Sequence, residues 1–155
     1  MHTGIRSFAN KKAAYVTDIA EISRLERLAK QASQNAYCPY SKFSVGAVVV
    51  TDTGEEFAGC NVENASYALT ICAERNAVFQ MVAREKRQIA IVVIYTQTPV
   101  PSAPCGACRQ VINEFGPTAR IISFCDGQER IDTILAELLP QAFGPKNLAR
   151  SPARD

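Results

Sequence analysis

Apolar residues first recur at helical spacing shortly after the start of the chain. Asp18, followed three residues later by Glu21, is typical of an N-cap pair at the start of a helix. The stripe that follows predicts one buried helical face extending to about residue 35. It consists of Ile19, Ile22, Leu25, Ala29 and Ala32. We expect residues 1–16, which precede this pattern, to be a flexible leader.

Segments rich in β-branched residues then alternate with helical patterns. Residues 44–50 and 56–62 flank the turn sequence TDTGE and predict a β-hairpin. The pattern is helical over 72–84 and becomes a continuous apolar strand at 89–96, typical of a sheet covered on both faces. The remaining expected elements are a loop with three prolines at 97–104, a helix at 105–115, a strand at 120–125 and a short helix at 131–139.

This order of elements predicts an α/β fold with three layers, in which helices cover both faces of a mixed sheet. The 155 residues, 47% of them hydrophobic, suit one domain with a substantial core. We expect that domain to occupy residues 17–146 and residues 147–155 to form a flexible tail.

Charge and hydropathy argue against several partners. The net charge of +2 gives little attraction for nucleic acid or an anionic membrane. The densest apolar run, at 89–95, is much shorter than the about 20 residues that span a bilayer. Six cysteines without a recognisable signal peptide indicate reduced thiols and a cytoplasmic protein rather than three disulfides.

Two of the cysteines form the C-x-x-C pair Cys105 and Cys108. Such a pair occurs in redox couples, in structural zinc sites and in catalytic zinc sites, and alone it does not separate them. Cys72 shifts the balance, because it also opens a predicted helix, where the backbone N–H groups stabilise a thiolate. Two such helix starts facing each other would present three thiolates to one Zn²⁺ and leave a position for water, as in catalytic sites.

The other candidate ligands have weaker claims. Cys38, Cys60 and Cys125 are not paired at ligand spacing and are expected to be small packing residues. The single histidine, His2, lies in the leader and is expected to be neither ligand nor base.

Three charged residues next to the cysteines complete the candidate site. Three thiolates on one Zn²⁺ leave a net negative charge, which Arg75 and Arg109 would offset by donating hydrogen bonds to the thiolates. Glu74 lies two residues after Cys72, and with no usable histidine it is the natural proton carrier for a water on the metal.

These residues resemble the zinc-dependent cytidine deaminases, whose signature is H/C-x-E followed by P-C-x-x-C. Here the signature reads Cys72-Ala73-Glu74 and Pro104-Cys105-Gly106-Ala107-Cys108. The cysteine in first place is similar to the small homotetrameric branch of that family. The resemblance covers about residues 20–145 and includes PYSKFSVGA, GCNVENASY, CAERNA, PCGACRQV and LLPQAFGP. Asn76 departs from it, since we expect a small apolar residue there.

The resemblance implies a sheet of about five strands, one Zn²⁺ per chain and hydrolytic deamination of cytidine and 2′-deoxycytidine in pyrimidine salvage. In that reaction water attacks C4 of the base, Glu74 moves protons to N3 and to the departing amine, and ammonia leaves.

The resemblance also implies the substrate contacts. Phe43 would pack against the pyrimidine ring, Asn61 and Glu63 would bond the ribose hydroxyls, and the backbone near Ala73 and Cys105 would hold the base edge. Without the resemblance, core packing for Phe43 and a polar turn for Asn61 and Glu63 would be the simpler interpretations.

Two further aromatic residues, Tyr67 and Phe143, are implied to reach the pocket of a neighbouring subunit. The active sites of a homotetramer would then be shared between its chains.

Four other functions compete with this hypothesis. A blasticidin S-type deaminase shares a similar zinc site, but Glu63 in NVEN favours a ribose. Editing of polynucleotides lacks a basic, aromatic-rich track for a single strand. A non-catalytic zinc module and a C-x-x-C oxidoreductase leave the combination of Cys72, Glu74 and NVEN unexplained.

Overall fold

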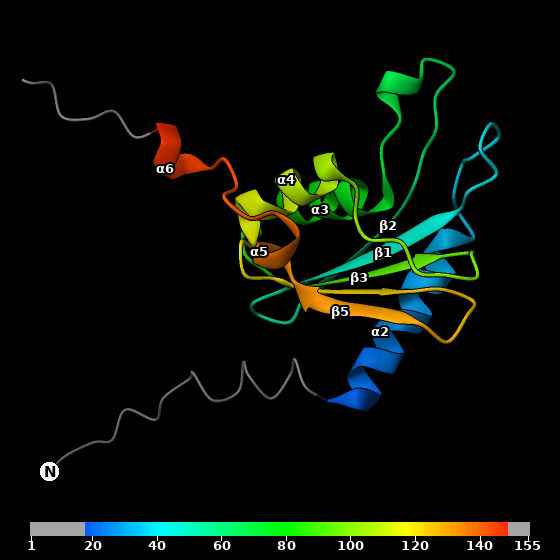
Figure 1. Ribbon diagram of the computed structural model, residues 1–155, viewed down its shortest axis with the longest axis horizontal. Coiled ribbons are helices and arrows are strands. Elements are labelled where there is room, and N and C mark those ends of the chain that lie inside the picture. The colour runs from blue at the N-terminus through cyan, green and yellow to red at the C-terminus, as the bar shows by residue number, and fades with distance from the viewer. Residues whose placement is uncertain (1–17, 149–155) are drawn as a thin grey trace, which may run out of the picture.

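A mixed sheet of five strands forms the centre of the fold in the computed structural model, which describes residues 18–148 (Figure 1). The strand order is β2-β1-β3-β4-β5. Only β3 and β4 run parallel, and the other neighbouring pairs are antiparallel. The strands are β1 (Val45–Thr51), β2 (Glu56–Cys60), β3 (Ile89–Thr96), β4 (Arg120–Phe124) and β5 (Arg130–Ile134).

Helices cover both faces of the sheet, which confirms the three-layer prediction. The helix α2 packs on one face, whereas α3 and α4 lie side by side on the other (Figure 1). The helices are α2 (Ile19–Ser33), η1 (Tyr67–Leu69), α3 (Ala73–Ala83), α4 (Gly106–Phe115), α5 (Leu135–Leu138) and α6 (Pro145–Leu148). As predicted, Asp18 caps α2 by accepting a hydrogen bond from the Ala20 N–H at 3.0 Å.

The alternation of side chains along each strand divides the core into two clusters. In β1, Ala47 and Val49 pack beneath α3 and α4, while Val48 and Val50 pack against α2. Because successive side chains of a strand point to opposite faces, an uninterrupted apolar run fills both clusters.

Two glycines allow the helices to approach the sheet closely. A Cβ on Gly46 would lie 1.9 Å from the carbonyl oxygen of Ala29 in α2. A Cβ on Gly59 would lie 2.5 Å from the carbonyl oxygen of Ala73 in α3. Gly59 therefore fixes how deeply the first turn of α3 sits on β2.

The expected helix at 131–139 is wrong over its first half. Residues Arg130–Ile134 form β5, which pairs with β4 through contacts such as Ile122 with Asp132. The helix α5 covers only Leu135–Leu138. The apolar spacing of this segment suits a helix, but the free edge of β4 offers a complete ladder of hydrogen bonds to an extended chain, and this pairing prevails.

Other boundaries differ slightly from those expected. The second hairpin strand ends at Cys60, and Val62 instead makes isolated bridges to Tyr37 and Ile71. The expected leader at 1–16 and most of the expected tail lie outside the described residues, although α6 includes residues 147 and 148. None of the helices within residues 18–148 has both the length and the apolar character needed to cross a bilayer.

Candidate metal centre and substrate site

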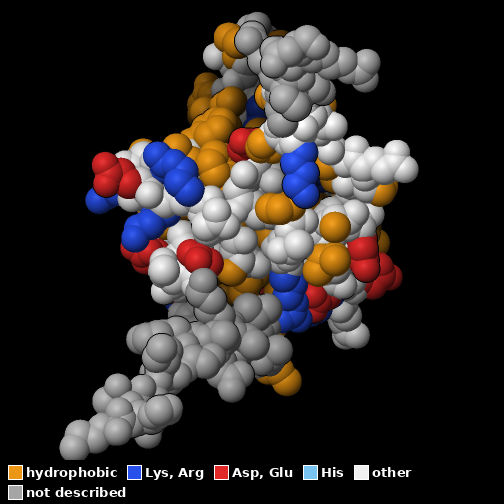
Figure 2. Space-filling view, turned by 90° about the vertical axis from the view of Figure 1, so that its left-hand side faces the viewer, with side chains coloured by type: hydrophobic (Ala, Val, Ile, Leu, Met, Phe, Trp, Pro, Cys, Tyr) orange, Lys and Arg blue, Asp and Glu red, His pale blue; other side chains and the backbone are white. Residues whose placement is uncertain are grey.

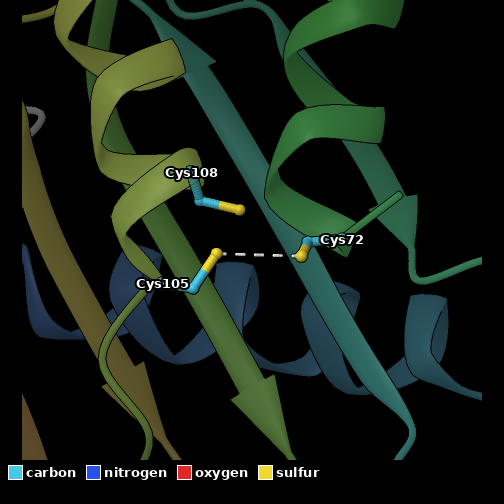
Figure 3. Close-up of side chains that lie close together, drawn as sticks. All are labelled: Cys72, Cys105 and Cys108. Carbon is cyan, nitrogen blue, oxygen red and sulfur yellow. Dashed lines mark hydrogen bonds between the residues drawn. The ribbon is translucent and has the colours of Figure 1, made fainter. Parts of the chain in front are cut away.

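Three thiols converge between the N-terminal ends of α3 and α4 (Figure 3). The Sγ atoms of Cys72, Cys105 and Cys108 all lie within 4.8 Å of one another. The Sγ atoms of Cys72 and Cys105 are 3.9 Å apart. Thiolates bound tetrahedrally at about 2.3 Å from a zinc ion lie about 3.8 Å apart, so this donor set suits Zn²⁺ with little movement.

All three thiols lie at or within one turn of a helix N-terminus. Cys72 and Cys105 are the N-cap residues of α3 and α4, and Cys108 lies one turn further into α4. Neither N-cap thiol bonds the end of its own helix, so both remain directed at the shared centre. Hydrogen bonding from the Cys108 thiol, followed by that from Arg75, lowers the pKa of Cys72 to about 5. One thiolate therefore forms readily at neutral pH, which favours metal binding.

The two arginines next to the cysteines have different contacts. The Arg75 guanidinium donates to the carbonyl oxygen of Thr70 at 2.8 Å and to the Sγ of Cys72 at 3.7 Å. Arg109 instead donates to the carbonyl oxygens of Pro104, at 2.7 Å, and Leu138, at 2.8 Å. The expected contact with a thiolate is thus present for Arg75, whereas the observed bonds of Arg109 go to the backbone.

The carboxylate of Glu74 is buried beside the thiols, and only 5% of the residue is exposed. Burial raises the pKa of Glu74, and the nearby charge of Cys72 adds to the rise. Because desolvation disfavours the charged form, this carboxyl takes up a proton more readily than one in water. A raised pKa beside a group of metal-binding thiols is typical of a residue that transfers protons.

The segment after β2 carries the predicted ribose-binding residues and pairs with the residue that precedes Cys72. Val62 and Ile71 exchange backbone hydrogen bonds at 2.9 and 3.0 Å, which places NVEN beside the chain that leads into Cys72. Asn61 is buried, and its amide donates to the carbonyl oxygen of Phe43 at 2.8 Å. Phe43 itself is 40% exposed, so it is accessible to a ligand and does not belong to the core.

The Glu63 carboxylate holds the loop that precedes Phe43. It accepts hydrogen bonds from the N–H groups of Tyr40, at 2.9 Å, and Ser41, at 3.2 Å. The Ser41 hydroxyl and then these N–H groups lower the pKa of Glu63, so it is ionised at neutral pH. A hollow of about 220 Å³ opens beside it. The hollow is lined by Tyr40, Ser41, Glu63, Tyr67 and Thr70.

The two aromatic residues expected at a subunit boundary are exposed and lie on different segments. Tyr67 is 72% exposed in η1, on the arm between β2 and α3 that projects from the body (Figure 1). Phe143 is 57% exposed and belongs to the segment between α5 and α6. In Figure 1 this segment lies at the opposite end of α3 and α4 from η1. The chain does not bring these two segments together.

The remaining cysteines lie apart from the metal-binding group of the described residues. Cys60 bonds the carbonyl oxygen of Asn35 at 3.3 Å, and Cys125 contacts that of Pro99 at 3.5 Å. Cys38 is a partly buried free thiol. His2 lies outside the described residues.

Comparison with known proteins identifies the family. A family model described as the cytidine and deoxycytidylate deaminase zinc-binding region matches residues 20–125, which include all three converging cysteines. The chain belongs to the cytidine and deoxycytidylate deaminase family. The resemblance to cytidine deaminases is therefore confirmed, and zinc is the metal of the matched region.

Relatives and solved structures of cytidine deaminases agree with this assignment. The chain is 39% identical over 130 residues to the cytidine deaminase of Sporosarcina psychrophila, covering 83% of this chain and 96% of the relative. It is 41% identical over 116 residues to that of Halalkalibacterium halodurans, covering 74% and 88%. The crystal structure of cytidine deaminase from Burkholderia pseudomallei superimposes with a TM-score of 0.75 at 46% identity, covering 78% of this chain and 98% of that one.

Some contacts of this deaminase fold were not predicted from the sequence. The Asn76 amide donates to the carbonyl oxygen of Cys60 at 3.1 Å, which accounts for a polar residue at that position. Gln110 and Asn113 of α4 both donate to the carbonyl oxygen of Phe143. The only available signal was their spacing of three residues on the helix that begins at Cys105, and polar residues at that spacing are common on exposed helices.

Proposed function

We propose that this protein catalyses the hydrolytic deamination of cytidine and 2′-deoxycytidine to uridine and 2′-deoxyuridine, with release of ammonia, in pyrimidine salvage. The observation that carries the proposal is the convergence of Cys72, Cys105 and Cys108 beside the buried carboxylate of Glu74. The family assignment and the cytidine deaminase relatives support the same substrate class.

In this proposal the three thiolates hold one Zn²⁺ per chain. The bound ion supplies Lewis-acid activation of a water molecule for attack at C4 of the base. Glu74 would accept one proton from the attacking water and deliver it to N3, and would then move the second proton from the new C4 hydroxyl group to the amine, so that the C4–N bond breaks and water and cytidine become uridine and ammonia. Arg75 donates to the Cys72 thiolate and offsets part of the negative charge of the ligand set.

The substrate contacts follow from residues around the thiols. Phe43 packs against the pyrimidine ring, and the backbone near Ala73 and Cys105, at the two helix starts, holds the base edge. Asn61 and Glu63 bond the ribose hydroxyls with the hydrogen-bonding capacity that their backbone contacts leave unused.

We further infer a homotetramer with shared active sites. The exposure of Tyr67 and Phe143, on segments that the fold keeps apart, leaves both rings available to a neighbouring copy. Cys72, Cys105 and Cys108 must stay reduced to bind the metal, which supports a cytoplasmic location.

A free nucleoside suits the surface better than a polynucleotide. On the face shown in Figure 2, Lys and Arg side chains are interspersed with Asp and Glu and form no continuous basic track. Binding of a single strand requires a positively charged groove with exposed aromatic residues along it.

Conversion of cytidine by the zinc-loaded protein, followed as loss of ultraviolet absorbance, tests the reaction. We expect the wild type to produce uridine and ammonia, and Glu74→Gln to lose at least about 100-fold in kcat while keeping one zinc per chain. Glu114→Gln, which changes an exposed carboxylate of α4, is the matched control and should retain activity. A zinc-loaded wild type that leaves cytidine and 2′-deoxycytidine unchanged would refute the proposal.

Co-expression of two defective chains tests whether sites are shared. Glu74→Gln retains Phe143, and Phe143→Ala retains the proton carrier, so mixed oligomers should regain activity that neither variant has alone. Gel filtration of the wild type should show a species larger than one chain. A fully active monomer would exclude shared sites.

A further inference from the structure

The helix that carries two of the thiols also holds the segment that carries Phe143. The Gln110 amide donates to the carbonyl oxygen of Phe143 at 2.8 Å. The Asn113 amide, one turn further along α4, donates to the same oxygen at 3.4 Å. One backbone carbonyl thus receives two side-chain donors from the helix that begins at Cys105.

A third side chain of α4 holds the start of the same segment. Arg109 donates through one nitrogen to the carbonyl oxygen of Leu138, at the end of α5. Through another nitrogen it donates to the carbonyl oxygen of Pro104, the residue immediately before Cys105. The backbone from Leu138 to Phe143 is therefore tied at both ends to the element that positions Cys105 and Cys108.

The hydrogen bonds next to Phe143 on its C-terminal side are local, because Gly144 and Asn147 bond each other and so do not connect Phe143 to α4. The Phe143 ring is 57% exposed, and Leu148, which ends the short helix α6, is 71% exposed. Gln141 adopts a positive φ of 55°, a conformation that non-glycine residues favour only when their surroundings hold them there. Side-chain donors fixed on a rigid helix reduce the conformational freedom of such a segment.

We propose that Gln110 and Asn113 are positioning residues that hold Phe143 at a fixed place relative to α4. The Phe143 ring is then already ordered when it meets the nucleoside. This inference rests on the proposed function, in which Phe143 of one copy contacts the substrate of another. It assigns the two amides a role in substrate affinity and none in zinc binding or proton transfer.

Fluorescence tests the positioning without relying on activity. The chain contains no tryptophan, so Phe143→Trp introduces a single reporter at the position in question. Adding Gln110→Ala and Asn113→Ala should lower the anisotropy of this reporter and raise its quenching by acrylamide about twofold, because the segment gains local freedom. Gln80→Ala is the matched control, since it removes a similar amide-to-carbonyl bond of 2.7 Å on α3 and should leave the reporter unchanged.

Kinetics in the background without tryptophan supply the second measurement. The double variant Gln110→Ala/Asn113→Ala should raise KM for cytidine about fivefold, with kcat within about twofold of wild type and zinc content unchanged. Gln110→Ala alone keeps the longer Asn113 contact and should give a smaller change of the same sign, which preserves the test if the double variant fails to fold.

Two results would overturn the inference. One is a reporter whose anisotropy and quenching do not respond to loss of the amides. The other is loss of zinc in the double variant, which would mean that the amides stabilise α4 and not Phe143. If the wild type does not deaminate cytidine, the proposed function fails, but the fluorescence result still shows whether the amides hold the segment.

Discussion

The side-chain oxygen of Asn61 accepts a hydrogen bond from the buried N–H of Val45 at 2.8 Å. The other end of the same amide donates to the carbonyl oxygen of Phe43 at 2.8 Å. Asn61 therefore fixes the backbone on both sides of Ser44, where the loop carrying Phe43 enters β1. A residue expected to bind ribose thus also places the residue expected to contact the base.

Replacing Asn61 with alanine should weaken both stability and substrate binding. The Val45 N–H and the Phe43 carbonyl oxygen would lose their partner at a buried site, so we expect the free energy of unfolding to fall by about 1–3 kcal/mol. KM for cytidine should rise as the Phe43 loop becomes less ordered. Urea denaturation followed by circular dichroism, together with steady-state kinetics, measures the two effects.

Asn64→Ala is the control for this substitution, because Asn64 is an exposed asparagine in the same segment whose side chain accepts from the Ser66 N–H at 2.8 Å. Its effect on unfolding should stay below about 1 kcal/mol. Equal losses for the two variants would mean that the Asn61 contacts contribute no more than an exposed turn.

The contrast between two glycines gives a second prediction. Gly59→Ala would push a Cβ to 2.5 Å from both the Ala73 carbonyl oxygen and the Ala77 N, so α3 must move away from β2. Since Cys72 and Glu74 lie at the start of α3, we expect a loss of more than about 2 kcal/mol of stability and reduced zinc content. Thermal melts and elemental analysis of the purified variant would detect both changes.

Gly106→Ala is the matched substitution at the start of α4, the helix that follows Cys105. A Cβ at Gly106 meets no atom within 4 Å, and alanine favours a helix by about 1 kcal/mol over glycine. This variant should be as stable as wild type or more so, and should retain zinc. A Gly59→Ala protein with unchanged melting temperature and zinc content would show that α3 tolerates the displacement.

The sequence predicted those features that depend on local pattern. The apolar run at 89–96 is β3, and Cys72 and Cys105 begin helices as expected, so their convergence follows from two neighbouring helix starts on the same face of the sheet. The strand β5 was missed because the apolar spacing of its residues suits a helix, although the chain folds back across residues 125–129 and pairs β5 antiparallel with β4 as a hairpin.

Side-chain contacts between distant segments also could not be predicted from the sequence. Arg75 and Arg109 each follow a cysteine closely, yet one bonds a thiol and the other two carbonyl oxygens. What separates them is the position of Leu138, which only the packing of α5 against α4 determines. For the same reason, no local signal identified Gln110 and Asn113 as partners of Phe143.

An ion pair on the α2 face predicts a dependence of stability on pH. The Asp126 carboxylate accepts from the Lys30 ammonium at 2.8 Å and from the Tyr95 hydroxyl at 2.7 Å. Lys30 and then Tyr95 lower the pKa of Asp126, so the stabilisation is present above the unfolded value of about 3.9 and is lost as pH falls through the folded value. Asp126→Asn should therefore melt below wild type at pH 6, with the difference vanishing as the pH falls below the folded pKa of Asp126.

The size of this difference should be small, because the side chains of Lys30 and Asp126 are about half exposed. A double-mutant cycle with Lys30→Met isolates the charge interaction. In that background the effect of Asp126→Asn should shrink at pH 6. An unchanged effect of Asp126→Asn in the Lys30→Met background would mean that the charge of Lys30 does not cause the pH-dependent stabilisation.

The guanidinium of Arg75 gives the prediction most directly connected to the metal. It links the Thr70 carbonyl oxygen, at 2.8 Å, to the Cys72 thiol, at 3.7 Å. We expect these contacts to orient the thiol and to offset the charge of the thiolate. Arg75→Gln should lower zinc affinity about 10–100-fold, measured by competition with a chromogenic chelator. Arg75→Lys should fall in between, because it retains the charge but not the guanidinium geometry that places one terminal nitrogen against both acceptors. Arg84→Gln, at the exposed end of the same helix, should bind zinc as tightly as wild type. Overlapping competition curves for Arg75→Gln and Arg84→Gln would show that Arg75 has no influence on the ligand set.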